Sequence, residues 1–266
     1  KAQLSDPGEF LKMCINGIVE YGGELGELLK ETFKDISAEN AAKAFQHAGV
    51  EVGKTINQLQ KSFGVAREQM TSLLKSANFS AINIASGLSG ALGFNDEEIL
   101  QQLKAVQFPS FDIGGAMHSI FNWDSNTLAA RMKLSGFSVE DVAAIAQGLF
   151  QLDNNGLATV LNKAGYSIGE VTNAFQKVFN LDTNSIVGSL YVAGFSAEDL
   201  TDLCKNAFNI TNAVDVGDML ERAGVPPIHI ENVIKVKFPD SITKWTPKAS
   251  VDKAVDYVKS KIKIRW

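Results

Sequence analysis

Histidine, cysteine and proline are all scarce in this chain. Its 266 residues include three histidines, two cysteines and six prolines. Cys14 and Cys204 stand 190 positions apart, so we expect no disulfide between them, and two cysteines assign no redox compartment. His47, His118 and His229 have no Glu or Cys partner at metal-ligand spacing. The sequence therefore predicts no metal site and no cofactor.

Long apolar runs and catalytic motifs are also missing. No stretch reaches the roughly 20 apolar residues of a membrane-spanning helix, so no transmembrane segment is predicted. We expect no enzyme, because the chain has no Gly-x-Ser-x-Gly elbow, phosphate-cradling loop or dinucleotide fingerprint. No signal peptide is visible and the chain begins at Lys1. We therefore expect a soluble chain that is processed or excised from a longer one. The sequence does not assign its compartment, and secretion is one possibility.

Positive charge is scarce outside the C-terminal segment. Residues 225–266 hold nine Lys/Arg and four Asp/Glu, a balance of +5, which leaves 16 basic and 26 acidic residues in 1–224, a balance of −10. Phosphate backbones are bound through clustered Lys and Arg. Nucleic acid is therefore not the expected partner, and weak binding should be confined to the basic tail, at Lys259, Lys261, Lys263 and Arg265.

The most informative feature that the chain does have is a repeat of 29 residues. An aromatic residue or valine opens each unit, and in several units it follows Ala-Gly or Ser-Gly. The spacing is 29 with a final step of 30, and the opening residues are Tyr21, Val50, Phe79, Phe108, Phe137, Tyr166, Phe195 and Val225. A fixed period of about 20–50 residues is the signature of a repeat architecture.

Each unit reads as two short helices separated by turns. Ser138 with Asp141 approximates a helix-capping box after Phe137, and apolar residues then recur at helical spacing up to Phe150. A turn with an apolar residue such as Leu152 precedes the second helix. We interpret the aromatic residues that open the units as core rather than as a ladder for stacking bases, because an apolar residue before the cap staples the helix start.

The second helix of each unit has its own markers. An apolar residue recurs late in this helix and is predicted to be buried: Phe45, Leu74, Leu103, Met132, Leu161, Leu190 and Leu220. Glycine closes most of these helices, as expected for a left-handed residue after a helix end, and Asn78 is the usual substitute. Gln107 is predicted to break this pattern.

These patterns predict an all-α fold, a right-handed α-solenoid of seven helical-hairpin repeats with terminal caps. Residues 1–20 form the N-terminal capping helix, 21–224 the repeats, and 225–266 a C-terminal cap and basic tail. Within the last segment, residues 225–238 should pack on the final repeat, whereas 239–266 should lie outside the repeat geometry. The apolar residues expected to cover the two ends of the array are Phe10, Leu11, Cys14 and Ile18 at the first end and Ile228, Ile230, Val233 and Ile234 at the other. The end at Ile262–Trp266 fits either a helix or a strand.

The repeat unit resembles known helical-hairpin families. The run Gly-Phe-Ser-x-x-Asp-Val at 136–142, and its approximate copy at 194–200, is similar to the opening of TAL-effector-like repeats. It also resembles mitochondrial transcription termination factor repeats and helical repeats of secreted or surface bacterial proteins. The first two resemblances imply a superhelical nucleic-acid binder. This chain departs from them, because apolar Leu152, Leu181 and Ile210 occupy the turn where TAL-type repeats carry DNA-reading residues, and because it lacks the proline of termination-factor repeats.

The function predicted from this architecture is a non-enzymatic scaffold that binds a protein or other macromolecular partner. Two alternatives remain, a TAL-like nucleic-acid binder and a toxin-type membrane-active module. The candidate partner-contact residues all lie in the tail: Trp245, Lys259, Lys261, Lys263, Arg265 and Trp266.

Overall fold

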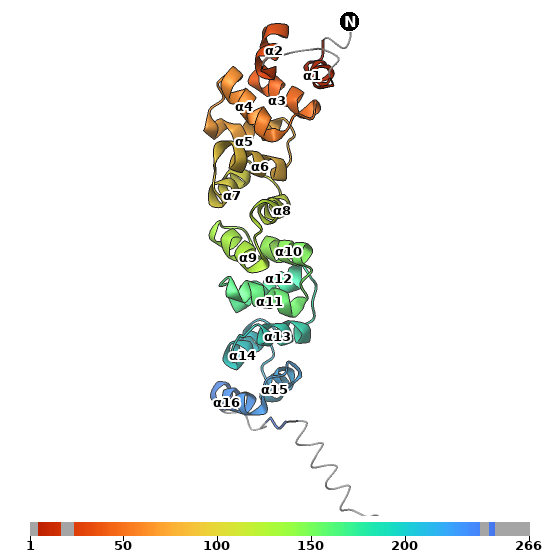
Figure 1. Cartoon of the computed structure of the whole chain (residues 1–266). Coiled ribbons are helices and arrows are strands. Elements are labelled where there is room, and N and C mark those ends of the chain that lie inside the picture. The colour runs from red at the N-terminus through yellow and green to blue at the C-terminus, as the bar shows by residue number, and fades with distance from the viewer. Residues whose placement is uncertain (1–4, 17–23, 240–244, 248–266) are drawn as a thin grey trace, which may run out of the picture. The chain divides into compact units, whose positions relative to one another are not determined.

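The structure is a computed structural model that describes residues 5–16, 24–239 and 245–247 (Figure 1). These residues contain sixteen α-helices and no strand, which confirms the all-α prediction. The chain divides into two compact units, Lys1–Asp124 and Ser125–Trp266, and each is described by itself. In the described part, no helix is long and apolar enough to cross a membrane.

Each unit contributes eight of the described helices. Unit 1 contains α1 Pro7–Ile15, α2 Leu25–Thr32, α3 Ala38–His47, α4 Val52–Phe63, α5 Arg67–Ser76, α6 Ala81–Leu92, α7 Asp96–Ala105 and α8 Ser110–Phe121. Unit 2 contains α9 Ser125–Leu134, α10 Val139–Phe150, α11 Asn154–Lys163, α12 Ile168–Lys177, α13 Thr183–Val192, α14 Ala197–Asn206, α15 Ala213–Arg222 and α16 Pro227–Lys237.

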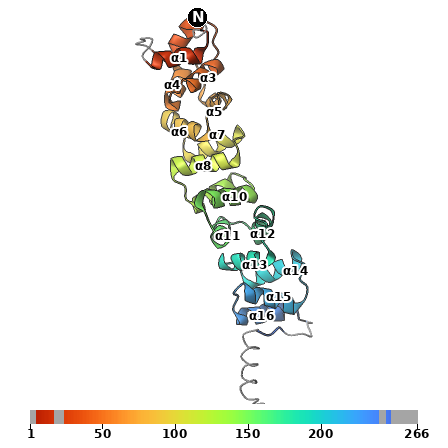
Figure 2. The ribbon, with the colours of Figure 1, turned by 90° about the vertical axis from the view of Figure 1, so that its right-hand side faces the viewer.

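The helices pack in two rows within each unit. In unit 2 the odd-numbered helices α9, α11, α13 and α15 each contact the next odd helix, and the even-numbered helices α10, α12, α14 and α16 do the same. Figure 2 shows α11 and α13 on one side of this unit and α12 and α14 on the other. Unit 1 follows the same order, with α1, α3 and α5 in one row and α2, α4, α6 and α8 in the other.

Residues with positive φ end the helices at regular intervals. After the odd helices they are Gly49, Asn78, Gln107, Gly136, Gly165, Gly194 and Gly224. Asn78 therefore takes the predicted left-handed conformation, but the prediction that Gln107 breaks the series is wrong, since its φ is 60°. The turn is held by backbone hydrogen bonds to the preceding helix, and these impose the left-handed conformation on glutamine despite the steric cost to its Cβ.

A second left-handed series follows the even helices and was not foreseen from the sequence. Its members are Gly64, Gly93, Asn122, Gln151, Asn180 and Asn209, spaced 29 residues apart. Only the first two are glycine, so the glycine pattern that marks the other series is absent here. Asparagine tolerates this conformation better than most residues, and its recurrence is the signal that the sequence offers.

The predicted core position in the odd helices is confirmed. All of these side chains are fully buried: Phe45, Leu74, Leu103, Met132, Leu161, Leu190 and Leu220. The helix starts also follow the sequence, since Ser138 accepts a hydrogen bond from the Asp141 amide at 3.1 Å and Ser167 forms a reciprocal capping box with Glu170. Local capping and a periodic apolar stripe are therefore sufficient to place the helices.

Lysines join successive helices of one row. Lys75, near the end of α5, donates to the carbonyl of Gln107 beyond the end of α7 at 3.0 Å. Lys133 of α9 donates to the carbonyl of Gly165, and its ammonium group lies 4.4 Å from the centre of the Tyr166 ring. Cations are favourable at helix C-terminal ends, where carbonyl groups lack partners. These lysines therefore bind the ends of neighbouring helices and do not form an exposed basic surface.

The two ends match the sequence prediction in part. At the N-terminal end Phe10 and Leu11 of α1 are buried and Cys14 is half-buried, whereas Ile18 lies outside the described residues. At the other end α16 contacts α14 and α15. There Ile230 and Ile234 are buried and Val233 is half-buried, but Ile228 was expected on the inner face and is 59% exposed. Ile228 stands in the first turn of α16, on the side away from Ile230 and Ile234.

A buried tyrosine hydroxyl lacks a partner in unit 2. Tyr166 is buried, and its hydroxyl has no hydrogen-bond partner, whereas phenylalanine occupies the equivalent positions 137 and 195. We expect Tyr166→Phe to raise the free energy of unfolding by about 1 kcal/mol, because an unsatisfied buried hydroxyl is costly. Urea denaturation at neutral pH measures this, with Tyr191→Phe, at a half-buried tyrosine, as the control expected to shift stability by less than about 0.5 kcal/mol.

The same variant has a signature at alkaline pH. Burial, with smaller contributions from Glu170 and Glu140, raises the pKa of Tyr166 from 10 to about 12. The unfolded state therefore loses this proton first, so the stability of the natural chain relative to Tyr166→Phe is constant below pH 10 and falls as the pH rises from 10 through about 12. Relative to Tyr166→Phe, the natural chain should lose stability across that interval. Parallel stability curves for the two proteins would contradict this account of the hydroxyl.

Candidate functional site

The structure places one of the six predicted partner-contact residues. Trp245 is only 5% exposed, and its indole N–H donates to the carboxylate of Asp218 on α15 at 3.1 Å. A Cβ at Gly217 would lie 2.3 Å from the indole ring, so the ring rests directly on the backbone of α15. Trp245 is therefore packed within unit 2 and does not offer its ring to a partner. The signal for this contact is the glycine at 217 in an otherwise regular helix.

The remaining tail candidates have no position in the structure. Lys259, Lys261, Lys263, Arg265 and Trp266 all lie outside the described residues. The prediction that the tail carries the basic contact surface therefore remains a prediction.

The three histidines occupy separate surroundings. His47 Nε2 lies 2.7 Å from the Glu9 carboxylate, His118 Nδ1 lies 2.8 Å from the carbonyl oxygen of Trp123, and His229 is exposed. Across 5–16, 24–239 and 245–247, no group of three His, Cys, Asp or Glu side chains is arranged to hold a metal ion. His47 and His118 therefore each have a hydrogen-bond partner within unit 1.

Neither cysteine is set up as a nucleophile. Burial raises the pKa of the Cys204 thiol to about 11, and its Sγ lies 3.6 Å from Met219 Sδ. Burial also raises the pKa of the Cys14 thiol. Because the thiolate is the reactive form, both groups are poor nucleophiles at neutral pH.

An open groove of about 380 Å³ crosses the odd-numbered helices of unit 2. It begins at the first turn of α11, runs over α13 and reaches the end of α15. The lining side chains are mostly small or neutral and polar: Asp153, Asn154, Asn155, Ser185, Gly188, Ser189, Val192 and Ala223. We refer to this set as the α13 groove.

The floor of the α13 groove comes from one face of a single helix. Ser185, Gly188, Ser189 and Val192 follow one another at spacings of three, one and three, so they lie along one side of α13. A Cβ at Gly188 would meet no atom within 4 Å, and Val192 is 59% exposed. The groove is therefore wide enough at its floor to admit larger side chains or a backbone segment.

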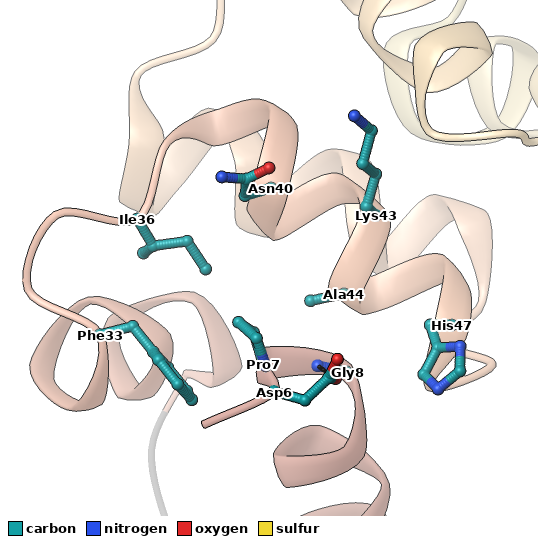
Figure 3. A pocket seen from close by; sticks show the side chains of 9 residues that line it. All are labelled: Asp6, Pro7, Gly8, Phe33, Ile36, Asn40, Lys43, Ala44 and His47. Atoms are coloured by element: carbon teal, nitrogen blue, oxygen red, sulfur yellow. Dashed lines mark hydrogen bonds between the residues drawn. The ribbon is translucent and has the colours of Figure 1, made fainter. Parts of the chain in front are cut away.

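A second cavity, of about 420 Å³, lies in unit 1 between α1, the loop before α3, and α3 (Figure 3). We call it the α1–α3 pocket. Its apolar wall consists of Pro7, Phe33, Ile36 and Ala44. In Figure 3, Phe33 and Ile36 stand on one side of the space and Pro7 and Ala44 border its middle. The wall is rigid because the Phe33 ring packs edge-on against Phe10, with centres 5.7 Å apart.

The polar wall of the α1–α3 pocket carries groups of both signs. It contains Asp6, Asn40, Lys43 and His47, with Asn40 and Lys43 opposite Asp6 in the view of Figure 3. A hydrogen bond with His47, followed by the hydrogen bond and the charge of Lys12, lowers the pKa of Glu9, which therefore stays ionised beside the pocket at neutral pH. The pocket thus combines an apolar body with a charged rim, the composition typical of small-molecule sites.

The sequence analysis identified neither hollow. Each is lined by residues more than 30 positions apart, and none of the lining side chains forms a recognisable motif. The sequence signals for these hollows are two glycines. Gly8 lets α1 come close to α3 beside the pocket, and Gly188 leaves open space on α13 in the groove. No family model, curated protein or solved structure matches this chain.

Proposed function

We propose that this chain is a non-enzymatic α-solenoid of seven helical-hairpin repeats that binds a polypeptide partner across the α13 groove. Two features support the solenoid. The helices pack in odd and even rows within each unit, and the left-handed residues of each series recur every 29 residues, apart from a final step of 30. Stacked hairpins bury a shared core and leave long faces for recognition.

The α13 groove is the observation that carries the proposal. The carboxamides of Asn154 and Asn155 can both donate and accept hydrogen bonds, and the Ser185 hydroxyl, which donates to Asp182 Oδ2 at 2.6 Å, can still accept one. Such groups complement the alternating N–H and C=O groups of a polypeptide backbone, and the exposed Val192 adds an apolar contact. The small floor residues allow a backbone to come close to α13.

Charge favours a polypeptide over a nucleic acid. Residues 125–224 hold six Lys/Arg against eleven Asp/Glu, a balance of −5. Lys133 and Lys205 are occupied at the ends of neighbouring helices. The charged residue that lines the groove, Asp153, is acidic. A phosphate backbone would meet net negative charge here.

Photo-crosslinking tests this proposal with a matched pair of positions. Gly188 on α13 and Gly169 on α12 are both helical glycines whose Cβ would meet no atom within 4 Å, so p-benzoylphenylalanine fits at either. We expect the group at 188, but not at 169, to crosslink a protease-sensitive and nuclease-resistant partner in extracts of the natural source. A nuclease-sensitive adduct would instead favour the nucleic-acid alternative, and equal labelling at 188 and 169 would rule out the α13 groove.

A further inference from the structure

The α1–α3 pocket has the size and rigidity of a small-molecule site. Its volume of about 420 Å³ lies within the range of about 300–1,000 Å³ typical of such sites. The wall between α1 and α3 is fixed, because a Cβ at Gly8 would lie 2.6 Å from the His47 ring. α1 therefore sits directly on α3 and cannot carry a larger residue at this contact.

The apolar half of the pocket is organised before any ligand enters. The Ile36 amide donates to the Phe33 carbonyl at 2.9 Å, which holds the loop that carries both side chains. Phe33 is further held by its edge-on contact with Phe10. A ligand with an apolar body would therefore bury it here with little loss of side-chain freedom in the protein.

The basic groups of the pocket already have carboxylate partners. Lys43 Nζ lies 2.7 Å from the Glu39 carboxylate. His47 Nε2 lies 2.7 Å from the Glu9 carboxylate, which also binds Lys12 at 3.1 Å. Among the described residues, each basic side chain at the pocket is therefore paired with a carboxylate and is not free to bind an anionic ligand.

Asp6 is the charged group that remains without an ionic partner. Its Oδ1 accepts the amides of Gly8 and Glu9 at 2.8 and 2.9 Å, and no described cation pairs with the carboxylate, which leaves Oδ2 for a ligand. Asp6 is therefore the acidic side chain of the pocket lining that can pair with a cationic ligand.

We propose that the α1–α3 pocket binds an organic ammonium ion with an apolar body. The ammonium group donates to Asp6 Oδ2, and the apolar body packs between Phe33 and Ile36. Charge-assisted hydrogen bonds of this kind are among the stronger polar contacts in proteins. This site lies in unit 1, apart from the α13 groove, and does not depend on the proposed partner-binding function.

Three probes of matched shape test the chemistry. Phenethylamine carries the ammonium, 2-phenylethanol is its neutral counterpart, and phenylacetate is anionic. Titration of the full chain followed by ¹H–¹⁵N NMR should show phenethylamine shifting the amides of residues 33–47. The alcohol and the acid should bind at least about tenfold more weakly, the ratio that corresponds to about 1.4 kcal/mol.

Asp6→Asn separates ligand binding from helix capping. Asparagine caps helices as well as aspartate does, so α1 should stay folded while the charge is lost. We expect phenethylamine to bind this variant about tenfold more weakly. Asp182→Asn is the matched control, because Asp182 caps α13 in the same manner and lies outside the pocket. It should leave affinity within about twofold, as for other remote surface changes.

A further pair of probes distinguishes the source of the ammonium. If the natural ligand is the N-terminus of a polypeptide, Phe-Gly-Gly should bind at least as tightly as phenethylamine and should lose binding on N-acetylation. If it is a free amine, phenethylamine should bind more tightly than the peptide. Equal affinity of phenethylamine and 2-phenylethanol, unchanged affinity in Asp6→Asn, or no shift at residues 33–47 would each overturn the site.

Discussion

Replacing Leu161 by alanine should lower the free energy of unfolding by about 2–5 kcal/mol, the cost of emptying a fully packed leucine site. Leu161 is 0% exposed near the end of α11, which packs against α9 and α13 in its own row and against α10 and α12 in the other. The cavity would open between helices that contact one another mainly through this apolar layer. Leu190→Ala, at the equivalent place on α13, should cost a similar amount.

Leu134→Ala provides the control for this prediction. Leu134 ends α9 and is 83% exposed, so its truncation should change stability by less than about 0.5 kcal/mol. Urea denaturation followed by circular dichroism measures all three variants. Repeat arrays need not unfold in one step, so hydrogen exchange of the α11 and α13 amides should accompany it. A loss below about 1 kcal/mol for Leu161→Ala would show that the assigned buried face of α11 is wrong.

Removing the Trp245 side chain should cost up to about 3–5 kcal/mol, as for other large buried aromatic residues. The ring covers Gly217 on α15 and donates a hydrogen bond to Asp218, so Trp245→Ala uncovers a helix and leaves a carboxylate without this donor. The loss should appear locally, as faster hydrogen exchange in α15 and a lower melting temperature. Residues 239–266 were expected to lie outside the repeat geometry, and this contact shows that the segment nevertheless supplies a buried side chain to unit 2.

Two further variants test the same contact from either side. Truncation after Phe238 removes Trp245 with the tail, and Gly217→Leu places a side chain where the indole lies. Because each change abolishes one shared contact, combining Gly217→Leu with Trp245→Ala should add little to either change alone. If neither the truncation nor Trp245→Ala alters the melting temperature, Trp245 does not stabilise the end of unit 2.

The helices of this protein were predictable because their causes are local. A serine cap with an acid three residues later, an apolar stripe of helical period and a glycine at the helix end all act within about one or two turns. Ser167 with Glu170 forms the expected box, and Leu161 and Leu190 are buried as expected. The repeat made each of these signals visible several times, which reduced ambiguity.

The errors arose where a residue is controlled by its surroundings rather than by its own preference. Gln107 has no preference for positive φ, yet the turn after α7 imposes it through hydrogen bonds to the preceding helix. Ile228 fits an apolar stripe, but the direction in which α16 meets α14 and α15 leaves it exposed. Trp245 has proline and charged residues as its sequence neighbours, a context typical of a surface residue. Its indole ring is nevertheless buried, because Gly217, 28 positions earlier, lets the ring pack against the backbone of α15.

The sequence by itself determined the helical class, the 29-residue period, the caps and the buried layer of the odd helices, because short-range hydrogen bonding and apolar periodicity specify them. The tertiary structure alone decided the α13 groove, the α1–α3 pocket, the lysine contacts between neighbouring helices and the place of Trp245. Each of these brings together residues about 30 or more positions apart in the chain. Such neighbours meet only after successive helices have packed, and the shape of the space between them depends on which small residues let the helices approach.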